Sequence, residues 1–210
     1  MRLNPLDADG PFGKLLKDIR LCKAKNTCPD LKVRTYYFEP NPETGAEWLR
    51  EDMYKDGIDS TVVFVCESPN RSFKSSRFKG VERDWAATGA KGKGFMEVRK
   101  AHGLENCYIT NSVKCGTRKG SRHTDSELRS CGQFLIRELE LIQPQVVVAV
   151  GGNAMYSLKT HVLPHLEVPP CFFQVTHYAA RINVWEAWKP EFKNLMRLIS
   201  RLKPRSQWKS

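Results

Sequence analysis

The sequence has no apolar run near the roughly 18 residues that a membrane-spanning helix requires. Its first residues, MRLNPLDADGPFGKLL, contain no apolar core of a signal peptide. We find neither an internal repeat nor a low-complexity arm. These absences favour a globular protein of the cell interior. At 210 residues, we expect one domain with a substantial core.

The cysteines do not suit a disulfide framework, because there are seven of them and the chain is expected in a reducing compartment. Metal binding or buried thiols are the better explanations. Acidic residues are also in the minority: 23 Asp and Glu face 34 Lys and Arg, which gives a net charge of +11. This balance favours a polyanionic partner, most simply nucleic acid, and the alternative is a solvated basic surface.

Short β-branched runs alternate with amphipathic segments along the chain. We predict strands over 61–66, 107–111, 146–150 and 172–176. We predict helices over 11–22, 95–102, 126–142, from 154 onward, and over 184–202. This alternation predicts an α/β fold, a three-layer sandwich with a central, mostly parallel four-stranded sheet flanked by helices.

Polar residues follow all four predicted strands, at the edge where open parallel sheets place their ligand sites. They are Glu67 to Asn70, Asn111, Gly151 to Asn153, and His177. An Asn amide offers one acceptor group and two donor hydrogens, which is what reading a nucleobase edge requires. We therefore predict a base-binding site at the strand ends, with Asn111 as its reader.

Six segments resemble, in chain order, motifs of the uracil-DNA glycosylase superfamily, most closely its iron–sulfur branch, family 4. They are CPDLKVR from residue 28, CESPN from 66, YITNSVKC from 108, RHTDSELRSC from 122, QPQVVVAVG from 143 and THYAA from 176. The resemblance implies a glycosylase that flips uracil out of DNA and hydrolyses its N-glycosidic bond in base excision repair.

The resemblance also implies roles for individual residues. The catalytic residues would be Glu67, Ser68 and His177, with His177 stabilising the departing uracil anion. The resemblance assigns Asn111 to the base; the family's stacking aromatic has no clean match, and we expect Asn70, Phe95 and Trp85 to contact the base as well, one of the rings stacking on it. The DNA would be contacted by Lys114, Arg118, Arg122 and Arg181.

The chain departs from the family pattern at several positions. Cys66 and Asn70 replace two glycines of the first motif, and Tyr178 replaces a proline. These changes leave open whether the base is uracil, a related deaminated base such as hypoxanthine, or both. His123 ends a basic loop from Arg118, which we interpret as a phosphate-gripping surface. One superfamily branch captures the sugar covalently with a histidine near here, but its Lys-Arg-Arg-Ile-His sequence is absent.

The family's cluster cysteines have counterparts here. Cys115 and Cys131 have the family spacing, and Cys28 matches the second N-terminal cysteine, while Lys25 stands at the first. Cys22 is the nearest replacement. We expect Cys22, Cys28, Cys115 and Cys131 to bind a [4Fe–4S] cluster, with zinc as the alternative. The other three cysteines, Cys66, Cys107 and Cys171, are expected in the core.

We thus predict one glycosylase-like domain over 1–210, to which residues 1–60 add two cluster cysteines and an inserted loop. Its partner would be DNA that contains the damaged base, with no membrane involved, and it would act as a monomer in a prokaryotic cytoplasm, at the nucleoid. Two alternatives stay open: a catalytically weak nucleic-acid-binding member of the same fold, and a hydrolase of small nucleotides.

Overall fold

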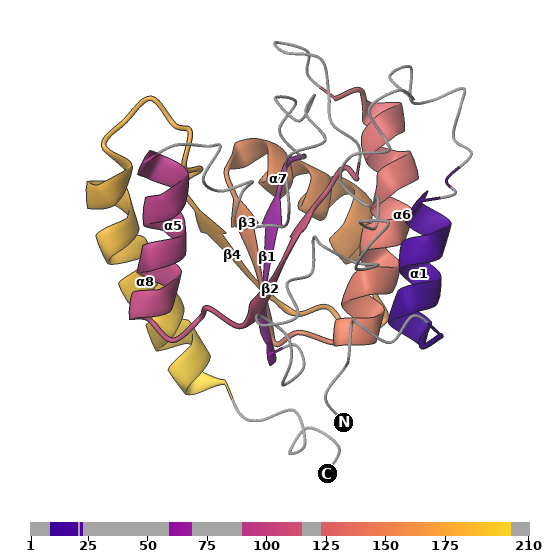
Figure 1. Cartoon of the computed structure of the whole chain (residues 1–210), viewed down its shortest axis with the longest axis horizontal. Helices are drawn as coiled ribbons and strands as arrows, with labels where there is room; N and C mark the ends of the chain where they lie inside the picture. Colours follow the sequence, from indigo (N-terminus) through magenta and orange to yellow (C-terminus); the bar gives the residue numbers. More distant parts are fainter. Residues whose placement is uncertain (1–8, 21, 23–58, 69–89, 115–122, 203–210) are drawn as a thin grey trace, which may run out of the picture.

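The computed structural model describes residues 9–20, 22, 59–68, 90–114 and 123–202 (Figure 1). The strands are β1 (Asp59–Cys66), β2 (Cys107–Asn111), β3 (Val146–Val150) and β4 (Cys171–Val175). The helices are α1 (Pro11–Arg20), α5 (Ala90–Ala101), α6 (Asp125–Ile142), α7 (Gly152–Ser157) and α8 (Val184–Arg201). A π-helical turn, η2 (Leu158–Val162), and a 3-10 turn, η3 (Leu163–His165), continue α7.

The four strands form one parallel sheet in the order β2-β1-β3-β4, which confirms the predicted fold class. From β1 the chain moves outward to β2, then crosses back to β3 and moves outward again to β4. The strand order therefore reverses between β1 and β3. In open sheets of this kind, the crevice at the carboxyl side of that point is where ligands bind.

Helices cover both faces of the sheet. In Figure 1, α5 and α8 lie on one side and α1 and α6 on the other. The side chains of β1 explain these layers, because successive residues of a strand point to opposite faces. Val62 and Phe64 pack with the α5–α8 layer, whereas Val63 and Val65 pack with the layer of α1, α6 and α7. All four side chains are fully buried.

The cysteines expected in the core lie there. Cys66 and Cys107 are buried in the α5–α8 side of the core, and Cys171 is half-buried against it. Burial raises the pKa of the Cys66 thiol to about 12, so this thiol stays protonated and unreactive at neutral pH. None of the helices in the described parts of the chain is long and apolar enough to cross a membrane.

Candidate functional site

The turn after β1 is fastened to the end of β2. Cys66 and Asn111 are paired in the last register position of the two strands. Beyond them, three bonds continue the connection: Ser112 N–H to the Cys66 carbonyl (2.8 Å), Val113 N–H to the Glu67 carbonyl (2.9 Å), and the Ser112 hydroxyl to the same carbonyl (2.9 Å). The backbone of Glu67 is therefore held beside that of Asn111, as expected for neighbouring strand ends.

The Asn111 side chain is nearly buried and unused by the fold. The residue is 5% exposed. Within the described ranges, its amide forms no hydrogen bond. The amide atoms keep some access to solvent, so water can occupy their bonding positions until a ligand replaces it. This amide is therefore available for a ligand at the strand ends.

A buried ionic network lies directly behind Asn111. The Lys114 ammonium donates to the Asn111 carbonyl at 2.7 Å, to the Thr110 hydroxyl at 2.8 Å and to the Glu138 carboxylate at 2.5 Å. Glu138 also accepts from Thr110 and, more weakly, from Tyr108. Lys114 is 2% exposed and Glu138 is fully buried. This burial contradicts the predicted DNA contact of Lys114, whose charge instead fixes the strand end that presents Asn111.

The end of β4 is held by α8. The Glu191 carboxylate accepts from both the backbone N–H (2.8 Å) and the hydroxyl (2.6 Å) of Thr176, and the Trp188 indole donates to the Thr176 carbonyl (2.9 Å). His177 follows directly. Its Nδ1 accepts from the Ala179 N–H at 3.0 Å, so the neutral ring carries its proton on Nε2. The Nε2–H group is then the donor that His177 can offer to a ligand.

Gly151, at the end of β3, is required for the position of His177. Its φ is +93°, a conformation that side chains with a Cβ rarely adopt. A Cβ on Gly151 would also lie 2.8 Å from the His177 Cβ. The backbone of Gly151 is fixed by its N–H, which donates to the Val175 carbonyl at 2.9 Å. The glycine thus lets the imidazole pack directly on the strand end.

Two histidines share the electrostatic influence of Glu67. Burial lowers the pKa of His177, and the nearby Glu67 carboxylate partly opposes this. The pKa of His123 is lowered by the same cause, opposed by Glu67 and Glu127. The His123 side chain is 3% exposed, and neither ring nitrogen forms a hydrogen bond within the described part of the chain. His123, predicted only as part of a phosphate-binding loop, therefore lies near the strand-end carboxylate.

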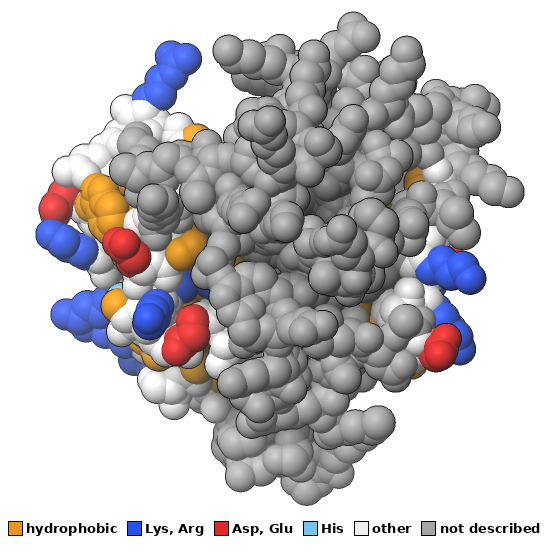
Figure 2. All heavy atoms as spheres, in the orientation of Figure 1, with side chains coloured by type: hydrophobic (Ala, Val, Ile, Leu, Met, Phe, Trp, Pro, Cys, Tyr) orange, Lys and Arg blue, Asp and Glu red, His pale blue; other side chains and the backbone are white. Residues whose placement is uncertain are grey.

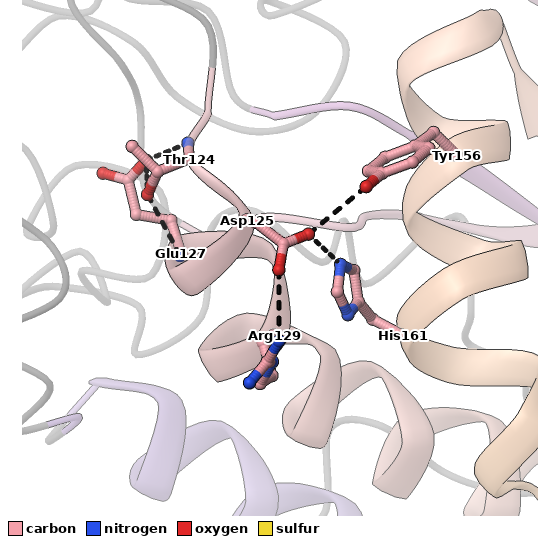
Figure 3. A network of polar contacts seen from close by, with 6 residues as sticks. All are labelled: Thr124, Asp125, Glu127, Arg129, Tyr156 and His161. Carbon is pink, nitrogen blue, oxygen red and sulfur yellow. Dashed lines mark hydrogen bonds and ion pairs between the residues drawn. The ribbon is translucent and has the colours of Figure 1, made fainter.

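The residue after His123 begins a firmly anchored helix (Figure 3). Thr124 and Glu127 form a capping box, in which each side chain bonds the other's backbone N–H. The first turn of α6 is also tied to the segment after β3, because Asp125 accepts hydrogen bonds from His161 at 2.8 Å and from Tyr156 at 3.3 Å. Within α6, Arg129 donates to Asp125 at 3.2 Å. The His161 bond is the main cause that lowers the pKa of Asp125.

The other predicted site residues divide into three groups. Phe95 is fully buried, with its ring against Phe64 and Trp188, so the predicted stacking on a base is contradicted and Phe95 is a core residue. Half-buried Ser68 and exposed Arg181 follow β1 and β4 at the site edge. Four predicted residues lie outside the described ranges: Asn70, Trp85, Arg118 and Arg122.

Two of the four predicted cluster ligands are described. Cys131 is buried on α6 beside Val113, which precedes Cys115 by two residues in the chain. Cys22 follows the last turn of α1, the helix that packs on α6. Cys28 and Cys115 lie outside the described ranges. Within those ranges, no three metal-binding side chains come together. The placement of Cys131 suits a site that also includes Cys115.

Two residues that build the site were missed by reasoning from sequence. Glu138 had a signal, because it is an acidic residue within the apolar side of α6 formed by Leu135, Leu139 and Ile142. Such a residue usually has a buried partner. Gly151 had only a weak signal, which was its place between a buried strand and a helix. Its contact with His177 exists only in the folded sheet.

The known proteins that the chain resembles all belong to one superfamily. The sequence model of the Uracil DNA glycosylase superfamily matches residues 53–203. A Type-4 uracil-DNA glycosylase of Archaeoglobus fulgidus is 37% identical over 97 residues, which cover 44% of each chain. One of Thermotoga maritima is 33% identical over 103 residues, 47% of this chain and 48% of the relative. A Type-5 enzyme of Pyrobaculum aerophilum is 45% identical over 47 residues, 22% of this chain and 20% of its own. The matched segments thus span about half the length of the first two relatives.

Proposed function

The chain belongs to the uracil-DNA glycosylase superfamily, and we propose that it is a monofunctional glycosylase that removes uracil, or a related deaminated base such as hypoxanthine, from DNA in base excision repair. The observation that carries this proposal is the side-chain amide of Asn111. It is nearly buried, it forms no hydrogen bond with the described residues, and it lies at the strand ends where His177 offers an Nε2–H donor.

Asn111 would select the base. Uracil presents an N–H donor at position 3 and a carbonyl acceptor at position 4, which match the oxygen and the NH₂ group of one amide. Cytosine has an amino group at position 4, so its pairing with the same amide would bring two donors together. A mispaired buried polar group costs about 1–3 kcal/mol, so this single amide can supply much of the selectivity.

His177 would assist departure of the base. As the N-glycosidic bond breaks, the bonding electrons move to the base and negative charge develops on its O2. A neutral imidazole whose Nδ1 is occupied by the Ala179 N–H can donate from Nε2 to that oxygen. Hydrogen bonds that strengthen as charge develops lower the barrier of the chemical step. Burial, which lowers the pKa of His177, keeps the ring neutral at physiological pH.

Glu67 and Ser68 are the candidates for positioning the water that completes hydrolysis. The departing base leaves a sugar cation, which needs little nucleophilic assistance, so a group that orients the water suffices. Glu67 is the better of the two because its backbone is fastened to the end of β2 and its carboxylate acts on His177. The water's oxygen would bond to the sugar carbon, and its proton would pass to the carboxylate or to solvent.

We also propose that Cys22, Cys28, Cys115 and Cys131 hold a [4Fe–4S] cluster, with zinc as the alternative. The support is a set of four thiols, of which the described Cys131 is buried beside Val113, close in sequence to Cys115. When bound, the cluster would serve structure, tying the segment after β2 to α6. We further propose that the protein acts on DNA as a monomer, in the cytoplasm and at the nucleoid.

Excision assays test the proposed activity. Labelled oligonucleotides that carry uracil, hypoxanthine or no damage are incubated with the protein, and abasic sites are cleaved and counted. Removing one donor to the developing anion typically costs about 10²–10³ in rate, which is the loss expected for His177→Ala. Asn111→Ala should lower the discrimination between uracil and cytosine as well as the rate.

A matched control separates catalysis from general damage. His165→Ala changes an exposed residue away from the strand ends and should leave excision unchanged. Failure to excise any deaminated base, with salt-dependent DNA binding retained, would favour the alternative of a catalytically weak nucleic-acid-binding protein. Preference for free nucleotides over DNA, without salt-dependent binding, would favour a small-nucleotide hydrolase.

Spectroscopy and metal analysis test the cluster. The purified protein should be brown, with a broad visible absorbance band and about four iron atoms per chain. Cys131→Ser should remove the band, while Cys171→Ser, at a half-buried core position, should keep it. A colourless protein with one zinc would identify the alternative metal.

A further inference from the structure

A row of cations lies on α8, outside the strand-end site. Lys189, Lys193 and Arg197 are all exposed and are spaced four residues apart, which places one positive charge about every 6 Å along the helix. Figure 2 shows several Lys and Arg side chains on the flank of the molecule that α5 and α8 form in Figure 1. We refer to these three residues as the α8 cationic row.

The row lines an open groove of about 620 Å³. Its other lining residues are Met196 and Ser200 of α8 and His102, which follows α5. The His102 ring is fixed, because its Nδ1–H donates to the Val98 carbonyl at 2.8 Å and the ring contacts Phe192 at 5.4 Å between centroids. The groove thus combines a line of charges with a fixed aromatic ring and a flexible thioether.

Acidic residues do little to neutralise the row. Lys189 pairs with Glu186 at 2.8 Å, but both side chains are largely exposed, so the pair is weak. Glu191 lies on the opposite side of α8, bonded to Thr176. Lys193 and Arg197 form no ion pair with the residues that the structure describes. The groove therefore keeps most of its positive charge.

The chemistry of the groove favours a nucleic-acid strand over an acidic peptide. Regularly spaced cations suit an anion that repeats its charge, and proteins that bind single strands combine such a charged groove with aromatic rings on which bases stack. Its position gives a second reason. Lys189 lies about one and a half turns from the start of α8, and α8 begins just after the loop that carries His177. From there the row runs toward the opposite edge of the sheet, where His102 precedes the start of β2, so a long strand that leaves the site can follow it.

We propose that the α8 cationic row and its groove bind the phosphate backbone of the DNA strand that flanks the excised base. The proposal rests on the proposed function for the identity of the strand. The groove extends the DNA-binding surface from the sheet edge along the side of the molecule. It should therefore matter for long substrates and be unimportant for short ones.

The test compares the triple variant Lys189→Gln, Lys193→Gln and Arg197→Gln with the unaltered protein. Binding of undamaged, labelled single-stranded DNA of about 30 nucleotides is measured across salt concentrations. Each neutralised phosphate of a single strand contributes about 0.7 to the slope of log K against log salt, so the slope should fall by about two. Excision KM should rise about tenfold on a uracil substrate of 30 nucleotides and stay unchanged on one of about 8 nucleotides.

The control carries the same change of charge elsewhere. Lys14, Lys17 and Lys159 are exposed on α1 and η2, and their Gln variants should leave slope and KM unaltered. Glutamine is a good helix former, and far-ultraviolet circular dichroism of both triple variants verifies folding. The proposal would be overturned if the salt slope fell equally in both triple variants, or if it did not fall in the α8 variant. Weakened binding of poly-L-glutamate with DNA binding intact would also overturn it and would assign the groove to an acidic protein.

The undamaged DNA separates this proposal from the proposed activity. A protein that excises no base but shows the reduced slope in the α8 variant would retain the groove and refute the glycosylase. A protein that excises uracil with equal KM on long strands in both triple variants would retain the glycosylase and refute the groove.

Discussion

The strand ends that carry Asn111 and His177 are supported in opposite ways. Behind Asn111 lie the buried charges of Lys114 and Glu138, and the lysine bonds directly to the Asn111 carbonyl. His177 instead rests on the bare backbone of Gly151 and on short-range bonds around the strand end. One support is an ion pair that is costly to break, and the other is a close contact that any added atom would disturb.

This difference corresponds to the two proposed tasks. Reading a base edge requires an amide fixed in two directions at once, because its donor and acceptor must both match. Assisting a leaving group requires one N–H aimed at one oxygen. We infer that the buried ion pair at β2 serves orientation, and that the packing at β4 serves the placement of a single atom.

The largest effect should come from breaking the support of Asn111. Lys114→Met leaves the Glu138 carboxylate buried without its counter-charge, which should lower the free energy of unfolding by about 3–5 kcal/mol. Urea denaturation measures this loss. Excision should fall as well, because the Asn111 carbonyl loses its bond to the ammonium group.

Two variants sharpen this result. Lys159→Met changes an exposed lysine and should cost little. Adding Glu138→Leu to Lys114→Met removes the uncompensated charge and should recover much of the stability, while the discrimination between uracil and cytosine stays impaired. If Lys114→Met were as stable as Lys159→Met, the ion pair would not be the main support of this strand end.

The support of His177 should be broken by Gly151→Ala. The new Cβ would meet the His177 Cβ at 2.8 Å and would impose an unfavourable φ, so the imidazole has to move. A misplacement of about 1 Å can cost about 10²-fold in rate, and the strained backbone about 1–3 kcal/mol in stability. Excision kinetics and urea denaturation should both be recorded.

The neighbouring glycine provides the matched control. A Cβ on Gly152 has nothing within 4 Å, so Gly152→Ala should leave excision unchanged. Equal activity of the two alanine variants would show that contact with Gly151 does not position His177.

A smaller effect should appear with pH, on the side of the molecule that carries His177. The pKa values of His177 and His123 are below their ordinary value of 6.5 in the fold, so the unfolded chain binds more protons as pH falls below about 6.5. Their contribution to stability is therefore complete above pH 6.5 and is lost as pH falls through the lowered pKa values. Each can contribute at most about 1.4 kcal/mol per pH unit.

Urea denaturation between pH 5 and 7.5 measures this dependence. The double variant His123→Gln and His177→Gln should show a flatter profile than the unaltered protein. His165→Gln, at an exposed position, should reproduce the original profile. An equally steep profile in the double variant would locate the titrating groups elsewhere.

The smallest effect should come from the cap of α6. Thr124→Ala removes the side-chain acceptor for the Glu127 N–H, and loss of such a cap typically costs about 1 kcal/mol. Ser126→Ala, an exposed neighbour, should cost less. Thermal unfolding compares the two variants. If Thr124→Ala kept the discrimination between uracil and cytosine, selectivity would depend on the ion pair behind Asn111 and not on the start of α6. That result would sharpen the contrast between the two strand ends.

Much of the fold could be predicted from the sequence because its signals are local. The apolar run at 61–66 and the helical period of 126–142 report burial directly, and their order determines a parallel sheet. Asn111 and His177 could also be placed at one edge, since carboxyl ends of parallel strands meet there. These inferences needed only the position of each residue within its own element.

The rest depended on contacts between elements. Lys114 reads in sequence as a surface cation, and only its bond to Glu138, 24 residues away, shows that it is buried. Phe95 reads as a stacking ring but packs on Phe64 across the layer. Burial is a property of the assembled layers, so the sequence alone could not distinguish a core aromatic or a buried lysine from functional ones.

The two anchors around residues 115–122 have an evolutionary consequence. Lys114, on one side, is fixed by buried charge, and the capped helix starting at Thr124 and Asp125 is fixed on the other. Neither anchor contains a residue of the other, so evolution can alter one of them while the other is inherited intact.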